Sequence, residues 1–85
     1  MTGRNQRWVI HLPITAPDLD RAAILARTAA RALAVLRVDV GETAVSPEDA
    51  QWNRQRVFCD RRLEHGRRCV LRNGHDSPCT HRPPR

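Results

Sequence analysis

The chain has 85 residues, 40% of them hydrophobic, and a formal net charge of +6 at pH 7. This length suits a single domain with a small core, and no apolar run is long enough to span a membrane, so a membrane protein is excluded. A core this small usually needs a further cross-link from a disulfide, a bound metal or a partner.

The positive charge is concentrated in the C-terminal part. Residues 1–53 carry six Arg and six Asp or Glu, whereas residues 54–85 carry nine Arg and three Asp or Glu, which accounts for the whole surplus. All fifteen basic residues are arginine. The lack of lysine, with abundant alanine, is typical of a GC-rich genome, so we interpret the position of the charge rather than the residue type.

Residues 8–14 predict a first β-strand, because apolar side chains alternate along them. The alternating residues are Trp8, Ile10, Leu12 and Ile14. Pro13 indicates that this strand ends there or lies at a sheet edge.

A helix is predicted from the region of Thr15 and Asp18, either of which can cap it, to about Leu36. One face is apolar and rich in alanine, which permits close packing against a sheet. This face consists of Leu19, Ala22, Ala23, Ala26, Ala29, Ala30, Leu33 and Leu36, with Arg27 and Arg31 lying away from it. A weaker second stripe is either scattered surface residues or a partner surface. It consists of Ile24, Thr28 and Val35.

Two more strands are predicted after the helix. Residues 37–45 alternate, with Gly41 at a bulge or bend, and residues 52–59 form the third strand. Between them, residues 46–49 have the form of a capping box with Pro at the first helical position, which predicts a turn or one short helix.

The predicted fold class is therefore α+β, a small β-α-β-β domain with a C-terminal structural zinc-binding loop. We expect one domain over residues 1–85, divided into a β-α-β-β body (1–58), a zinc-binding segment (59–81) and a tail (82–85).

All three cysteines and three of the four histidines lie in residues 59–81. No signal peptide is recognisable, so we expect a cytoplasmic, reducing location, in which such a cluster indicates a metal rather than disulfides. Three thiolates and one imidazole form the closed tetrahedral ligand set that structural zinc prefers. The spacing predicts Zn²⁺ bound by Cys59, Cys69, His75 and Cys79.

The fourth ligand is open at this point, because His65 or His81 could replace His75. Asn73-Gly74 and the Ser-Pro pair at 77–78 supply the turns that such a site needs. The competing interpretation is unrelated cysteines in a flexible tail. A full set of four protein ligands leaves no open coordination position, and we expect no enzymatic activity.

The same segment resembles the C-terminal region of short, mostly uncharacterised proteins of actinobacteria and their phages. The residues that match are Cys59, Gly66, Cys69, Leu71, Gly74, His75 and Cys79. The resemblance implies metal binding by a small cytosolic protein of bacterial or phage source, without enzymatic activity.

The basic charge around the zinc segment predicts a nucleic-acid-binding or regulatory module, acting through the DNA or RNA backbone. The predicted contact residues are Arg54, Arg56, Arg61, Arg62, Arg67, Arg68 and Arg72. On the third strand, Trp52 and Phe58 share a face with two of these arginines and could stack on single-stranded bases. Alternatively, both aromatic residues belong to the core and the arginines only solvate one face.

A different class of function is a protein–protein interaction adaptor or inhibitor. It would bind an acidic protein or a second copy of the chain through the second stripe of the helix or a free sheet edge.

Overall fold

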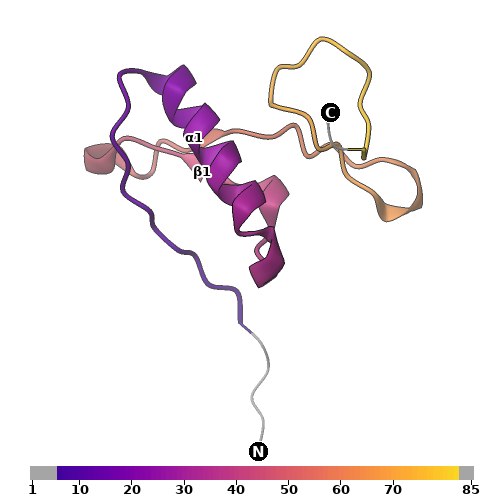
Figure 1. The fold of residues 1–85 in the computed structure, drawn as a ribbon, viewed down its shortest axis with the longest axis horizontal. Coiled ribbons are helices and arrows are strands. Elements are labelled where there is room, and N and C mark those ends of the chain that lie inside the picture. The colour runs from indigo at the N-terminus through magenta and orange to yellow at the C-terminus, as the bar shows by residue number, and fades with distance from the viewer. Residues whose placement is uncertain (1–5, 83–85) are drawn as a thin grey trace, which may run out of the picture.

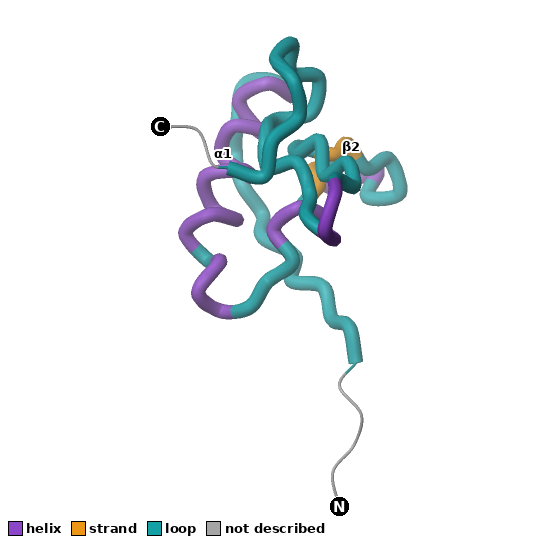
Figure 2. Tube along the Cα trace, turned by 90° about the vertical axis from the view of Figure 1, so that its right-hand side faces the viewer, coloured by secondary structure: helices purple, strands orange, loops and turns teal. Residues whose placement is uncertain are grey.

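The computed structural model describes residues 6–82 and is of mixed α+β class, as predicted (Figure 1). Its regular elements are the helix α1 (Leu19–Ala32) and two short strands, β1 (Ala44–Val45) and β2 (Gln55–Arg56), which pair antiparallel. Single turns of 3₁₀ helix and loops make up most of the remaining trace (Figure 2). Within the described residues, no helix combines the length and the apolar character needed to cross a membrane.

Helix α1 begins where the sequence predicts. The Asp18 carboxylate accepts a hydrogen bond from the Arg21 backbone N–H at 2.8 Å, which satisfies one of the free N–H groups of the first turn. The α-helix ends at Ala32 rather than Leu36, because residues 34–36 tighten into a 3₁₀ turn and Arg37 then adopts a left-handed φ of 65°.

The core lies between the alanine-rich face of α1 and the residues that follow β2. Ala30, Val57 and Phe58 are buried together. The partly buried residues packed against them are Ala23, Ala26, Val40 and Val45. The predicted apolar face is thus confirmed in its middle, whereas Leu19 and Leu36 at its two ends are exposed.

The predicted first strand is wrong. Residues 8–14 have no regular structure and their apolar side chains are exposed, Trp8 by 82%. The sheet of the described residues consists of two strands of two residues each, so it offers no long edge with which this segment could pair. The expected β-α-β-β order therefore lacks its first strand in the described residues.

The two later strands form, but they are much shorter than predicted. Residues 40–42 adopt a 3₁₀ turn instead of continuing the strand, and β1 begins only at Ala44. The turn or short helix predicted after residue 46 forms as a 3₁₀ turn over Glu48–Ala50, although without the side-chain hydrogen bond of a capping box.

Gly41 allows the body to contact the C-terminal segment closely. A Cβ atom at this position would overlap Asp60 Oδ1 and would lie 2.6 Å from Asp60 Cγ. The Asp60 side chain is only 11% exposed and faces the guanidinium groups of Arg56 and Arg68 at 3.5 and 3.9 Å, so it has little freedom to move away.

We therefore expect Gly41→Ala to lower the free energy of unfolding by about 1–3 kcal/mol, because the added methyl group overpacks this contact. Urea denaturation of the metal-loaded protein measures the change. Asp60→Gly removes the opposing carboxylate and suits the positive φ of 53° at that position. If the clash is the cause, the double variant loses less stability than the sum of the single variants; strict additivity would contradict it.

Candidate metal centre

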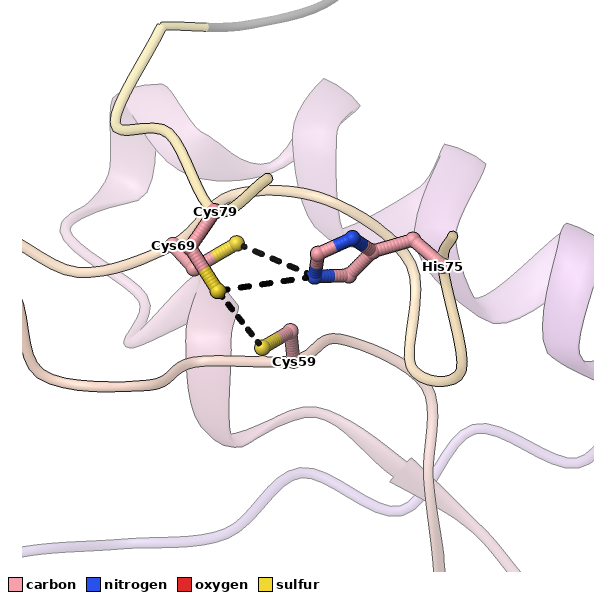
Figure 3. A group of neighbouring side chains, drawn as sticks. All are labelled: Cys59, Cys69, His75 and Cys79. Atoms are coloured by element: carbon pink, nitrogen blue, oxygen red, sulfur yellow. Dashed lines mark hydrogen bonds between the residues drawn. The ribbon is translucent and has the colours of Figure 1, made fainter. Parts of the chain in front are cut away.

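The structure brings together the four side chains that the sequence spacing singled out (Figure 3). One possible ligand atom from each of Cys59, Cys69, His75 and Cys79 lies within 4.8 Å of all the others. Cys69 is buried, and the other three side chains are partly buried. The group therefore has the donors and the proximity to hold one metal ion such as zinc.

The separations between ligand atoms match the edges of a small tetrahedron. Cys59 Sγ lies 3.9 Å from Cys79 Sγ, and His75 Nε2 lies 3.5 Å from Cys69 Sγ and 3.7 Å from Cys79 Sγ. Bond lengths of ~2.3 Å for Zn–S and ~2.0 Å for Zn–N imply tetrahedral edges of about 3.8 Å between sulfurs and about 3.5 Å between sulfur and nitrogen. Three of the six separations therefore match the edges of a zinc tetrahedron, and the other three do not exceed 4.8 Å.

An irregular antiparallel hairpin of residues 58–72, here called the metal hairpin, positions the first two cysteines. The Cys59 N–H donates to the Leu71 carbonyl at 2.8 Å, and the Cys69 N–H donates to the Arg61 carbonyl at 2.9 Å. Isolated bridges at both ends of this pairing join Phe58 to Arg72 and Arg62 to Arg68. Cys59 and Cys69 are far apart in the chain, and this backbone pairing brings them side by side.

A second turn, here called the metal loop (residues 70–80), places His75 and Cys79 beside the first two cysteines. The Val70 N–H donates to the Thr80 carbonyl at 2.9 Å and so closes the loop. Gly74 has a φ of 80°, which only glycine adopts without strain, and the His75 N–H donates to the Arg72 carbonyl at 3.2 Å. The turn predicted from Asn73-Gly74 therefore forms immediately before the histidine.

The orientation of His75 is fixed by a hydrogen bond on the side away from the cysteines. Its Nδ1 atom lies 2.7 Å from the Ser77 carbonyl oxygen. A carbonyl can only accept, so Nδ1 carries the proton and Nε2 is left with its lone pair directed at the sulfurs. This arrangement is typical of metal-binding histidines.

The surroundings shift the pKa values of the Cys69 and Cys79 thiols in opposite directions. Burial opposes ionisation of Cys69, but hydrogen bonds from the backbone of Leu71 and Thr80, and from the Cys79 and Cys59 thiols, lower its pKa to about 7. Burial and the neighbouring sulfurs raise the pKa of Cys79. The site thus stabilises one thiolate on its own, and further negative charge requires a cation at its centre.

The other two histidines of the segment do not join the group. His65 is exposed in the turn of the metal hairpin with a φ of 60°, and the His81 ring contacts the Arg67 guanidinium at 3.1 Å. Of the three imidazoles left open by the sequence, the geometry selects His75.

The predicted nucleic-acid-binding arginines do not form one surface with the aromatic residues. Strand β2 covers only Gln55–Arg56, and Phe58 is buried in the core at 2% exposure whereas Trp52 is 83% exposed. The prediction of a shared stacking face is therefore wrong, because the regular alternation of side chains along a strand is limited to Gln55–Arg56. For Phe58 the core alternative is correct.

The seven arginines themselves are all exposed. Two of them, Arg56 and Arg68, face the carboxylate of Asp60. Asp60 was not singled out from the sequence, yet it faces Arg56 of β2 and Arg68 of the metal hairpin and lies close to Gly41 of the body. Its position directly after a ligand, four residues from Arg56, is the only local signal of this role.

No protein-family model, curated protein or solved structure matches this chain. What the centre can do therefore follows from its own geometry and donor chemistry.

We expect His75→Ala to weaken zinc binding by more than about 100-fold, because it removes a primary ligand rather than an outer-shell partner. Competition with a chromogenic chelator measures the affinity. His65→Ala and His81→Ala are the matched controls and should bind zinc like the unaltered protein. Equal loss in His81→Ala and His75→Ala would show that the geometric selection of His75 is wrong.

Proposed function

We propose that Cys59, Cys69, His75 and Cys79 bind one Zn²⁺ in a structural site. The observation that carries this proposal is the proximity of the four possible ligand atoms, which lie within 4.8 Å of one another, with three of their separations, 3.5–3.9 Å, matching the edges of a zinc tetrahedron. A set of three sulfurs and one imidazole favours zinc over the harder divalent cations, which prefer oxygen ligands.

A structural role is favoured over a catalytic one because the protein fills all four coordination positions. A catalytic zinc keeps one position for water or substrate, and a carboxylate or another base stands nearby. Here the three cysteines and the histidine are close enough for all to bind at once. We therefore propose a non-enzymatic module.

Because the core is small, the proposed metal would supply much of the stability of the fold. Within the described residues, the buried hydrophobic side chains are those of Ala30, Val57, Phe58 and Cys69, and the last of these is a proposed ligand. Zinc coordination that is coupled to folding contributes on the order of 10–16 kcal/mol at neutral pH, more than burial of so few side chains provides.

Removal of the metal should therefore unfold at least residues 55–81. We expect chelation, or Cys69→Ser, to collapse the amide dispersion of this segment in a ¹H–¹⁵N NMR spectrum, because the metal hairpin and the metal loop lose their common anchor. Zinc added back to the chelated wild-type protein should restore the spectrum, whereas it should not restore Cys69→Ser. A fully demetallated protein with unchanged dispersion would contradict a structural role.

We further propose that the zinc-bound segment contacts the sugar–phosphate backbone of DNA or RNA. Nine of the fifteen arginines belong to residues 54–85, and on the metal hairpin Arg61, Arg62 and Arg67 are exposed. Among residues 6–82, none of these three forms an ion pair with a carboxylate, so their charge is available to an external anion. Such contacts bind without reading the base sequence.

Binding of a random single-stranded oligonucleotide should weaken steeply as salt is raised. Arg61→Gln should reduce the magnitude of the slope of log affinity against log salt by about 0.7. The variant makes one phosphate contact fewer, and so fewer condensed counterions are released on binding. A gel-shift titration at several salt concentrations measures both quantities. Arg37→Gln, the same charge change at an exposed residue at the end of the turn after α1, should leave the slope unchanged.

The second candidate function is a protein–protein interaction module, favoured by the exposed apolar side chains. Trp8, Val9 and Ile10 are more than half exposed, as is Val35 of the weaker helix stripe, and Ile24 is nearly half exposed. Such residues commonly mark an interaction surface. No oligonucleotide binding at physiological salt, together with a dimer by light scattering, would favour this function over backbone binding.

A further inference from the structure

An open cavity of about 510 Å³ lies between helix α1 and the metal loop. Arg27 and Arg31 line it from the helix, and Arg72 lines it from the loop. The wall on the loop side is completed by Leu71, His75, Asp76 and Ser77. The cavity thus adjoins the metal centre and is lined by more arginines than residues of any other type.

Each of the three arginines keeps hydrogen-bond donors free. Arg27 is partly buried and makes one long contact, from Nη1 to the Val57 carbonyl at 3.5 Å. The Arg31 guanidinium carbon lies 5.3 Å from the centre of the Phe58 ring, a cation–π contact that uses the face of the group and not its N–H edges. No carboxylate of residues 6–82 lies within ion-pair distance of any of the three.

The three positive charges are close enough to disfavour one another. The pKa of Arg27 is lowered by its burial and by the neighbouring charges of Arg31 and Arg72. Asp76 is the one carboxylate of the lining, and it does not pair with them. Like charges that converge on a cavity without an ion-pair partner are stabilised when an anion enters it.

We infer that this cavity binds a phosphate group, held by the forked guanidinium groups of Arg27, Arg31 and Arg72. Arginine forks match the oxygens of phosphate in pairs, and helix residues four apart lie on the same face. The volume is within the range of small-molecule sites and exceeds that of one inorganic phosphate, so a sugar or base attached to the phosphate also has room. The inference rests on the proposed backbone binding and locates one phosphate of it.

The site is complete only when the metal loop is folded. Arg72 stands between the proposed ligands Cys69 and His75, and its carbonyl accepts the hydrogen bond of the His75 N–H. The other two arginines belong to α1, so metal binding brings the loop half of the site to the helix half. Zinc affinity and phosphate affinity are therefore linked, and each ligand raises the affinity for the other by the same factor.

Titration of the zinc-loaded protein with inorganic phosphate, against chloride at equal ionic strength, tests this site. Arginine side-chain and backbone NMR signals should shift at Arg27, Arg31 and Arg72 and in the metal loop. Arg72→Gln should weaken phosphate binding about tenfold, because it removes a charge-assisted hydrogen bond, whereas Arg37→Gln should leave it unchanged. Asp76→Asn should strengthen binding, because it removes the one negative charge of the lining.

Arg31→Gln is a second variant, on helix α1 and outside the metal segment, and it should also weaken phosphate binding while zinc content and amide dispersion stay normal. Phosphate shifts spread over all exposed arginines, or equal weakening by Arg37→Gln and Arg72→Gln, would overturn the inference.

A single-stranded tetranucleotide distinguishes the two sources of the phosphate. If it competes with inorganic phosphate for the same signals, the site takes a backbone phosphodiester. If inorganic phosphate binds at the cavity but the tetranucleotide does not bind at all, the site holds a free phosphate and the backbone-binding proposal fails alone. If the tetranucleotide binds without shifting Arg27, Arg31 or Arg72, the cavity inference fails and backbone binding stands.

Discussion

The antiparallel pairing inside the metal hairpin is the constraint on which the other features of this protein depend. Hydrogen bonds from Cys59 to Leu71 and from Cys69 to Arg61 place two sulfurs side by side that nine residues separate in the chain. The same pairing begins at Phe58, whose ring fills the core against α1, and it extends to Arg72 beside the cavity. Core, metal centre and cavity are therefore connected through a single backbone ladder.

This ladder has little support from hydrophobic burial. The body contributes an alanine-rich helix face and a sheet of two residues per strand, and each alanine buries little area. Polar contacts supply part of the remaining connection, because the Asp60 carboxylate lies against Gly41 and faces Arg56 of β2 and Arg68 of the hairpin. These pairs involve exposed guanidinium groups, whose contribution in water is small, so the proposed metal coordination is the main stabilising interaction left to the segment.

The grouping of the three cysteines with His75 was predictable from the sequence, because it depends on the chemistry of a few residue types and on local turns. Cysteine and histidine are scarce residues with few other roles in a small basic chain, and Asn73-Gly74 fixes the turn before His75. The extent of the strands was not predictable in this way. Alternation along residues 8–14 indicates which side chains could share a face, but a strand also needs a partner edge, and the chain provides none for it among the described residues. The same reason explains why Trp52 and Phe58 do not share a face: the pairing of β2 stops at Arg56.

The cavity shows a different limit of sequence reasoning. On a helical projection, Arg27 and Arg31 lie away from the apolar face and therefore look like ordinary solvent-facing charges. Their environment is set by the metal loop, some forty positions later in the chain, which carries Arg72 to the same cavity. Because that loop carries proposed ligands on both sides of Arg72, the proposed zinc site predicts that metal occupancy changes the electrostatics at α1. Under the same proposals, the segment that completes the fold also determines whether an anion is bound, so that the stability of the protein and its affinity for phosphate would be two measures of the same folding event.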